Sequence, residues 1–386
     1  MASPSSSDPA GLAAAWSDLT EGLQRVGREL VAHASDPADA ADGTAHLAQL
    51  VQLALRWHVD ANDPDFPRFV HLNDTFELAD NRFAAVRNDA EYVLTGNVAS
   101  LFDVNISLHE GWGFLGQPGV WGDLGLADLD VADDGSFALV LGGGPTAPGR
   151  LEIPPEATIV QVREYYEDWD AHVPGTFAIT RRGSEGEAPP RCDPADVARR
   201  LGAVLPWIEG YLRAHGGMVE RLRTGLPANS ISPPGNQLGG NKNIQYGFGR
   251  FELDADQALV IEFALPDARL WSVQWLTDPW YENPDLANRS TSINGRHAHV
   301  GPDGVVRVVV SAADPGVPNW LDVGGYSRGV LMMRWIWCTA GSELSTEVVD
   351  VAKVREVLPA DTPTVTPEER RAEQARRRSH FAGRRR

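Results

Sequence analysis

Three things are scarce in this chain of 386 residues: cysteine, long apolar stretches and positive charge. The two cysteines, Cys192 and Cys338, lie far apart, which excludes a disulfide framework or a cysteine-based zinc site and favours a reducing cytosol. No apolar run approaches the roughly 20 residues that a membrane-spanning helix needs. Residues 1–7 also lack the basic and apolar regions of a secretory signal. We therefore expect a cytoplasmic protein without a membrane span.

The shortage of positive charge gives a net charge of −19 at pH 7. This argues against nucleic acid as a general partner, because nucleic-acid binding needs a basic face. Residues 367–386 are an exception, with eight arginines against three glutamates. We predict a basic C-terminal tail over residues 346–386, whose helix lies on the acidic surface of the protein. Because the segment has little apolar surface to bury, deletion of 367–386 should leave the fold intact.

Ahead of the basic tail, helical periodicity marks three stretches of the chain. Residues 11–33 carry apolar side chains three and four apart, and a second helix is expected over 45–58 after a linker of small residues at 34–44. Together they predict a helical hairpin within residues 1–65. A connecting helix is expected over 193–225, because Asp193 and Pro194 form a typical N-cap and first turn.

Short strands separated by turns fill most of the remaining chain, in keeping with its 38 glycines and 27 prolines. They predict a β-rich domain over 66–182 and a C-terminal jelly-roll-like β sandwich over 244–345. In the strand expected at 157–170, Gln161, Arg163 and Tyr165 share one face. The segment 227–243 is a candidate lid or binding loop. The predicted class is α+β and mainly β, with one or two jelly-roll-like antiparallel sandwiches and peripheral helices.

A rigid turn followed by a buried strand stands out at residues 314–337. Pro315 and Pro318 restrict the backbone beside Asn319 and Trp320, and an apolar strand that contains Arg334 follows. A guanidinium in such a strand needs an acceptor or a place at the open end of the strand. Two interpretations of Trp320 stay open: it forms a wall of a cleft, or it plugs the end of the sandwich.

Several short motifs follow one another in order from residue 258 to 335: 258–262 (ALVIE), 270–275 (LWSVQW), 290–294 (STSIN), the turn at Asp303-Gly304, 319–321 (NWL) and 334–335 (RW). In this succession the chain resembles the domain of unknown function 1214 family over roughly residues 245–338. The segment 163–169 (REYYEDW) is similar, though less distinctively, to the longer, mainly bacterial members of that family. The resemblance implies a jelly-roll-like sandwich for the C-terminal part. It implies no reaction and no catalytic residues, and the companion domain usual in that family is not evident in the N-terminal half.

Two motifs raise the question of catalysis or metal binding. Residues 325–329 match the G-x-S-x-G nucleophile elbow, but here a turn precedes Ser327 and a strand follows it, which is the wrong context. His297 and His299 would point to one side of a strand. A metal site also needs a third ligand, and the sequence does not show that the candidates Asp303, His109 or Glu110 converge on this pair. We therefore predict no metal and no cofactor, and the sequence leaves enzymatic turnover open.

Aromatic and polar residues of the strand-rich regions predict a small-molecule cleft, because pockets combine apolar walls with a few fixed polar groups. The leading hypothesis is binding of a small, largely apolar organic molecule. One alternative is a hydrolase or lyase, with or without a metal, that acts on a glycan or lipid-like substrate. Another is an interaction module that uses the arginine-rich tail to contact nucleic acid or anionic lipid. The oligomeric state is not predicted. The candidate ligand-binding residues are Arg163, Tyr165, Trp271, Trp275, Asn294, Asn319, Trp320 and Arg334.

Overall fold

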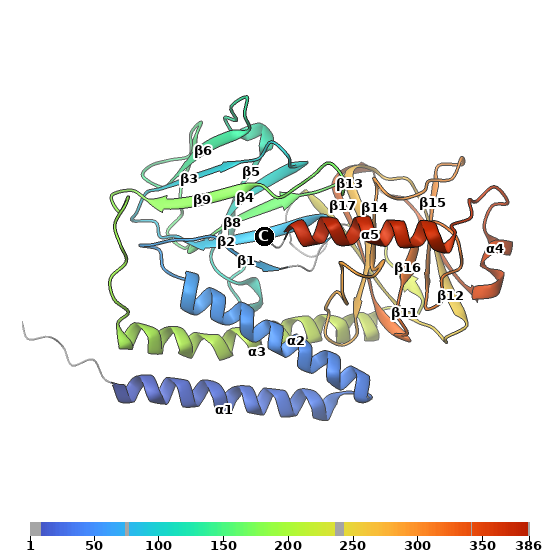
Figure 1. Ribbon diagram of the computed structural model, residues 1–386, viewed down its shortest axis with the longest axis horizontal. Coiled ribbons are helices and arrows are strands. Elements are labelled where there is room, and N and C mark those ends of the chain that lie inside the picture. The colour runs from blue at the N-terminus through green and yellow to red at the C-terminus, as the bar shows by residue number, and fades with distance from the viewer. Residues whose placement is uncertain (1–8, 74–76, 236–242, 341, 385–386) are drawn as a thin grey trace, which may run out of the picture.

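The computed structural model describes residues 9–73, 77–235, 243–340 and 342–384. Two β sandwiches lie side by side, with three long helices along one side of them and a further helix across another face (Figure 1). This architecture confirms the predicted mainly β class and fixes the number of sandwiches at two. Within the described ranges, none of the helices is both long and apolar enough to cross a membrane. Part of the predicted lid, residues 236–242, lies outside these ranges.

The N-terminal sandwich packs a five-stranded sheet, in the order β1-β2-β8-β4-β5, against a four-stranded sheet, in the order β7-β6-β3-β9. Its core contains Val104, Ile106, Val160 and Val162 from the larger sheet. The strands are β1 (Val70–Asn73), β2 (Ala79–Ala85), β3 (Tyr92–Asn97), β4 (Asp103–His109), β5 (Val120–Gly125), β6 (Ser136–Leu141), β7 (Arg150–Leu151), β8 (Ile159–Tyr165) and β9 (Thr176–Arg181).

The C-terminal sandwich has a five-stranded sheet in the order β10-β11-β17-β13-β14 and a four-stranded sheet in the order β16-β15-β12-β18. Trp271, Trp275, Met333 and Trp335 lie in its core. The strands are β10 (Ser230–Ile231), β11 (Ile244–Glu252), β12 (Gln257–Ala264), β13 (Asp267–Thr277), β14 (Ser292–Asn294), β15 (Val305–Ser311), β16 (Trp320–Asp322), β17 (Arg328–Ala340) and β18 (Leu344–Asp350). The sandwich therefore extends beyond the predicted end at residue 345.

The two sandwiches repeat one topology. Every strand of the first has its counterpart nine strands later in the second, in the same place in the same sheet. The match includes the parallel pairs: β6 pairs with β7 in parallel, and so does β15 with β16. The chain is thus built from two copies of a nine-stranded sandwich.

The alternation of residues along β8 positions its side chains as predicted. Val160, Val162 and Tyr166 point into the N-terminal core, whereas Ile159 and Tyr165 belong to clusters on the other face of the sheet. Since Arg163 lies between them in the period-two pattern, it also faces outward, toward the second sandwich.

Two of the three long helices lie against the outward faces of the five-stranded sheets, and the first helix packs on the other two. Helix α1 (Pro9–His33) and α2 (Pro37–Leu55) form the predicted hairpin, α2 continues as a π-helical turn (Arg56–Ala61), and α3 (Pro194–Gly225) runs beneath both sandwiches (Figure 1). Asp193 caps α3 as predicted, by accepting a hydrogen bond from the Ala195 amide.

Two predicted local structures were wrong. The stretch 34–44 is mostly helix, because Asp36 accepts hydrogen bonds from the amides of Ala38 and Asp39 and so starts α2 at Pro37. Residues 297–299 form a turn instead of a strand, because the amides of His297 and Ala298 bond to the carbonyl of Asn294. The histidine pair is therefore not displayed on a strand face.

The basic C-terminal segment is a docked helix. After the short helix α4 (Val354–Val357), α5 (Pro367–Arg384) crosses the front of the molecule from the C-terminal sandwich to the junction of the two sandwiches (Figure 1). Its buried residues are Arg370, Arg377, His380, Phe381 and Arg384.

These buried arginines bind both sandwiches. Arg370 forms an ion pair with Asp314 at 3.0 Å, and Arg377 donates hydrogen bonds to the carbonyls of Leu286 and Ser292 in the C-terminal half. Arg384 donates to the carbonyl of Glu77, at the start of the N-terminal sandwich. The helix does lie on the protein, as expected. These contacts argue against the expectation that removal of the helix leaves the fold intact. The helix has few apolar residues, but its buried arginines make the stabilising contacts with the protein instead.

Candidate functional site

The predicted cleft residues divide into separate groups. Trp271 and Trp275 lie inside the C-terminal core, exposed by 4% and 0%, and the Trp275 indole donates to the carbonyl of Asp322 at 3.0 Å. Both side chains are therefore packing residues in this structure.

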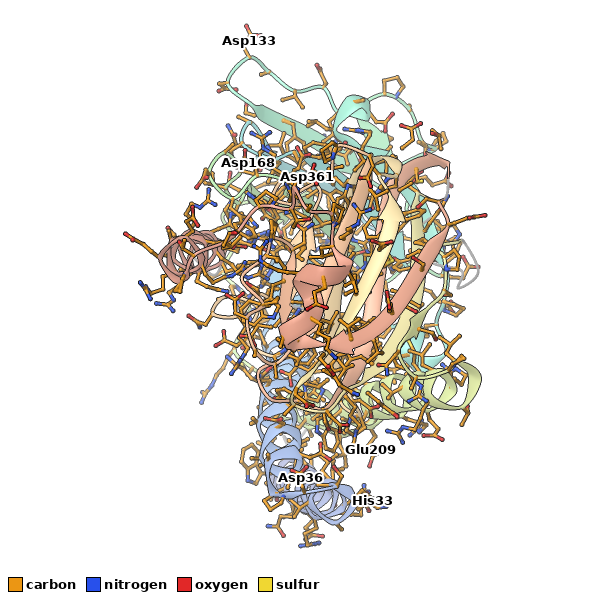
Figure 2. The ribbon with its side chains drawn as sticks, turned by 90° about the vertical axis from the view of Figure 1, so that its right-hand side faces the viewer. His33, Asp36, Asp133, Asp168, Glu209 and Asp361 are labelled. Atoms are coloured by element: carbon orange, nitrogen blue, oxygen red, sulfur yellow. The ribbon has the colours of Figure 1, made fainter. Side chains whose placement is uncertain are left out.

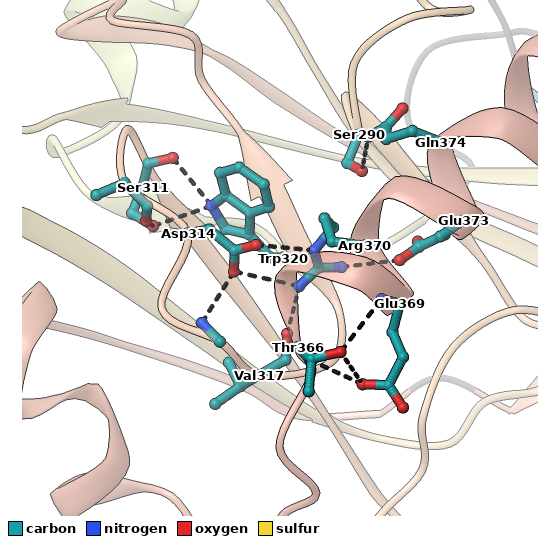
Figure 3. Close-up of polar contacts among 12 residues, drawn as sticks. Ser290, Ser311, Asp314, Val317, Trp320, Thr366, Glu369, Arg370, Glu373 and Gln374 are labelled. Carbon is teal, nitrogen blue, oxygen red and sulfur yellow. Dashed lines mark hydrogen bonds and ion pairs between the residues drawn. The ribbon is translucent and has the colours of Figure 1, made fainter.

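Asn319 and Trp320 stabilise a turn and the edge of the sandwich. Asn319 adopts a φ of 55°, and its side-chain amide accepts a hydrogen bond from the His299 amide and donates to the carbonyls of His299 and Arg307. The Trp320 indole donates to Ser311, and the guanidinium of Arg370 lies over its ring at 5.2 Å (Figure 3). Since α5 covers Trp320, this side chain forms no wall of an open cleft.

Asn294 joins the two sandwiches. Its amide nitrogen donates to the Glu77 carboxylate and to the Glu167 carbonyl, both at 3.0 Å, and its amide oxygen accepts from the amides of Arg296 and His297. Every hydrogen-bonding atom of this buried amide is used internally, which is a structural arrangement.

The remaining three residues, Arg163, Tyr165 and Arg334, come together between the sandwiches. Tyr165 belongs to an apolar cluster to which both five-stranded sheets contribute, and the charge of Arg163 acts on Arg334. The structure thus assembles three of the eight predicted residues and leaves the others elsewhere. That these residues bind a ligand stays a prediction.

The two candidate catalytic motifs are accounted for by packing. His297 stacks on Trp169 with ring centroids 4.0 Å apart, and burial lowers its pKa. Among the residues that the structure describes, no group of three or more histidines, cysteines or carboxylates could hold a metal. Ser327 lies in a turn directly before β17, so it lacks the strand-to-helix elbow of a serine hydrolase.

A cavity of about 1090 Å³ lies between α1, α3 and one end of the C-terminal sandwich. Figure 2 shows the helical hairpin projecting below this sandwich, with the lining residues His33 and Glu209 in that region. No motif in the sequence marked this site. The isolated Gly216-Gly217 pair within α3 was an available signal, because adjacent glycines in a helix interior weaken it unless space is needed.

The hairpin beside the cavity contacts both α3 and the C-terminal sandwich. Gly22 of α1 packs so closely against Leu205 of α3 that a Cβ there would lie 2.1 Å from it. Near the start of α2, the indole of Trp280 donates to Asp39 at 2.8 Å, and the Tyr326 hydroxyl donates to Asp42 at 2.7 Å. The hairpin therefore packs along α3 and also contacts the sandwich, and the cavity lies among these three parts of the structure.

The cavity has apolar walls and a charged rim. Val26 and Leu30 of α1 face Leu212 of α3, with Trp280 contributed by the sandwich. A Cβ on Gly216 would meet nothing within 4 Å, so this glycine opens directly into free space.

Most of the rim arginines are already paired. The hydrogen bonds that Arg25 donates to Glu209 and to Glu29 raise the pKa of its guanidinium. Arg223 contacts Asp278 at 2.5 Å. Arg213 is the exception: it is exposed, and among the described residues no carboxylate lies within 4 Å of it. It can therefore contact a ligand without first giving up a partner.

The polar side chains Ser35 and His33 of the lining are hydrogen-bonded within the protein. Ser35 is engaged by Asp39, at 3.0 Å, and by Arg328, while His33 contacts the carbonyl of Glu29. In the described lining, then, no hydroxyl is hydrogen-bonded to a histidine as an activated nucleophile would be.

Comparison with known proteins supports the fold and is silent on activity. No family model matches the chain, and no curated protein matches it. An uncharacterised protein from Burkholderia cenocepacia has a similar structure, with a TM-score of 0.82 and 26% identity over 90% of this chain and 100% of that one. A protein from Vibrio parahaemolyticus, with a TM-score of 0.42 and 13% identity over 78% of this chain and 96% of that one, is too dissimilar to carry an argument. The resemblance to the domain of unknown function 1214 family stays a prediction.

Proposed function

We propose that this protein binds a small, largely apolar organic acid in the cavity between α1, α3 and the C-terminal sandwich. The proposal keeps the small apolar ligand expected from the sequence and moves it from the predicted cleft to this cavity. Here the tryptophan is Trp280 and the arginine is Arg213.

The observation that supports the proposal most directly is the size and lining of the cavity. A volume of about 1090 Å³ is slightly larger than the usual range for small-molecule sites, roughly 300–1,000 Å³. Burial of an alkyl or aromatic body against Val26, Leu30 and Leu212 would provide the driving force. The choice of an acid follows from Arg213, whose guanidinium is available for a charge-assisted hydrogen bond.

The test uses one glycine that lines the cavity and one that does not. Both Gly216 and Gly202 are in α3, and a Cβ on either meets nothing within 4 Å, but Gly216 alone of the two lines the cavity. Leucine favours a helix at both positions. We expect Gly216→Leu to weaken binding of decanoate, measured by calorimetry, by about tenfold or more, since a lost 1.4 kcal/mol is a factor of ten. Gly202→Leu should bind as the wild type does.

A second pair of measurements tests the acid. Arg213→Met should reduce the affinity for decanoate toward the affinity for decanol, while decanol binding changes little, because the charge-assisted hydrogen bond is lost and the apolar contacts remain. The proposal is wrong if the wild type binds neither compound, or if Gly216→Leu and Gly202→Leu bind decanoate equally well.

The other predicted functions have no specific support. Catalysis by a hydrolase or lyase and contact through the arginine tail stay predictions, although Arg370, Arg377 and Arg384 of that tail are buried against the protein itself. The cytoplasmic location also stays a prediction and rests on the composition of the chain.

A further inference from the structure

Trp280 presents a fixed aromatic face to the cavity between α1, α3 and the C-terminal sandwich, the α1–α3 cavity. The residue lines the cavity and is 8% exposed, and its indole N–H donates to the Asp39 carboxylate at 2.8 Å. Gly43 of α2 packs on the same ring: a Cβ there would lie 2.4 Å from Cζ2 and 2.7 and 2.9 Å from the two neighbouring atoms, Cε2 and Cη2. Such similar distances place Gly43 over the face of the ring, because an approach to its edge would leave both neighbouring atoms distinctly farther away. The opposite face of the indole is therefore the one left for the cavity.

Bare helix backbone lies at the same end of the cavity as this indole. Tyr281, the residue after Trp280, has its ring 5.4 Å from that of His215, the residue before Gly216. Trp280 and Gly216 thus approach each other, and both line the cavity. A Cβ on Gly216 would meet nothing within 4 Å, and one on Gly217 would meet only the end of a flexible side chain, at 3.5 Å. This end of the cavity is therefore bounded by an indole face and by a stretch of helix without side chains.

The available guanidinium of the lining is one helical turn away from this bare stretch. Arg213 precedes Gly216 and Gly217 on α3 by three and four residues, so it lies on the same face of the helix, with about 5–6 Å between Cβ positions. Arg223, a further α3 arginine of the lining, is instead paired with Asp278 at 2.5 Å. An acid group attached directly to a ring beside the glycines is therefore within reach of Arg213.

We propose that the ligand of this cavity is a planar aromatic acid, whose ring stacks on Trp280 and whose carboxylate, attached to the ring, binds Arg213. This inference rests on the proposed function and narrows it from apolar acids in general to one class. Stacking on an indole adds to the free energy of apolar burial, because the charge distributions of the two rings attract each other in an offset arrangement. A flat ring also makes closer contact with an indole and a glycine backbone than a puckered or flexible body of the same carbon count does.

The experiment compares 2-naphthoate with its saturated analogue, decahydro-2-naphthoate, by calorimetry on the purified full chain. The two acids have the same carbon skeleton and the same carboxylate, but only naphthoate is flat and aromatic. Apolar burial alone would favour the saturated acid, because its additional hydrogen atoms give it more apolar surface. We expect the wild type to bind naphthoate about three- to tenfold more tightly instead.

Substitutions of two tryptophans test where the ring binds. Trp280→Leu keeps an apolar side chain but removes the aromatic face, so it should abolish the preference for naphthoate and change the affinity for the saturated acid less. Trp280→Phe, which keeps a smaller flat ring, should retain part of the preference. Trp16→Leu is the matched control, because Trp16 is 57% exposed on α1 and lies outside the cavity lining. It should bind both acids as the wild type does.

The outcomes separate this inference from the proposed function. If the wild type binds decanoate but binds the two ring acids equally, or prefers the saturated one, the cavity takes apolar acids without selecting aromatic ones and the inference is wrong. A Trp280→Leu protein that keeps the wild-type preference also overturns it. If Trp280→Leu does not fold, Trp280→Phe takes its place, and an unchanged preference in that variant is the contradicting result. A wild type that binds neither decanoate nor either ring acid overturns the proposed function, and the inference with it.

Discussion

The two sandwiches share one topology but use different residues at equivalent positions. Tyr165 of β8 and Ile336 of β17 occupy equivalent positions in the two sandwiches. The residues directly before them, Glu164 and Trp335, are therefore equivalent too. Both side chains are fully buried, yet Glu164 accepts hydrogen bonds from Arg82, Tyr166 and the Gly175 amide, whereas Trp335 packs among apolar residues. The fold therefore depends on the alternation and order of the strands, and it tolerates a charged network or a tryptophan at the same site.

The sandwiches also differ in how their outer faces are covered. Val354 of α4 and neighbouring apolar residues cover the four-stranded sheet of the C-terminal sandwich, including Val260 and Val309. In the described part of the N-terminal sandwich, no corresponding apolar cluster lies over the four-stranded sheet. The second sandwich is thus enclosed by segments that follow it in sequence. Of these C-terminal segments, helix α5 also contacts the N-terminal sandwich.

The largest effect should follow from removing the helix that the two sandwiches share. Deletion of residues 367–386 exposes Trp320 and Tyr166 and removes the buried contacts of Arg370, Arg377 and Arg384. We expect a loss of about 5 kcal/mol or more in the free energy of unfolding, because several charge-assisted hydrogen bonds of 1.5–3 kcal/mol each are lost. In calorimetry the single transition should separate into two. As a control, Arg376→Ala with Arg378→Ala, both exposed, should unfold as the wild type does. A truncated protein with an unchanged Tm would restore the expectation drawn from the sequence.

A smaller effect should distinguish the short edge strands of the two sandwiches. Trp320 of β16 and Arg150 of β7 each precede a core leucine, Leu321 and Leu151. Trp320 is 9% exposed, whereas the Arg150 side chain is 27% exposed in its ion pair with Glu91. Trp320→Ala should cost about 3–5 kcal/mol in chemical denaturation, and Arg150→Ala about 1 kcal/mol or less. If the two substitutions cost the same free energy of unfolding, Trp320 is not a packing residue and its interpretation as a cleft wall is reopened. Trp320→Phe would then be tested for altered ligand binding.

The smallest effect concerns acid. His109 of β4 occupies the position of Leu276 in β13, and its pKa is lowered to about 4. The unfolded chain takes up a proton near pH 6.5 and the folded protein does not, so stability is lost as the pH falls from about 6.5 to 4. His109→Leu should remove up to about 3 kcal/mol of this loss at pH 4. The exposed His33→Leu should leave the pH dependence unchanged. An identical pH profile for His109→Leu would mean that the pKa of His109 is the same in the folded and the unfolded chain.

Local features of the fold could be read from the sequence. The stripe of α1, the cap of α3 at Asp193 and the facing of Arg163 and Tyr165 on β8 all depend on near neighbours, and all three were predicted correctly. The partners of the α5 arginines are the carbonyls of distant residues such as Glu77 and Leu286, which no local pattern marks. The duplication was also hidden, because equivalent positions such as Glu164 and Trp335 share no chemistry. The α1–α3 cavity depends on how three separate segments meet, and only the glycine pair in α3 hinted at it.

The central strand of each five-stranded sheet has a consequence for how the chain is assembled. Strand β8 lies between β2 and β4, and β17 lies between β11 and β13, so in both copies the middle of the sheet is the last of these strands to be synthesised. Until it arrives, its two neighbours expose unpaired backbone groups, the kind of edge that captures strands from other chains. Contacts of such long sequence separation also form slowly. A cell that makes this protein must therefore protect two open sheets in succession during synthesis. Stalling just before residue 159 or residue 328 should yield the intermediates most prone to aggregate.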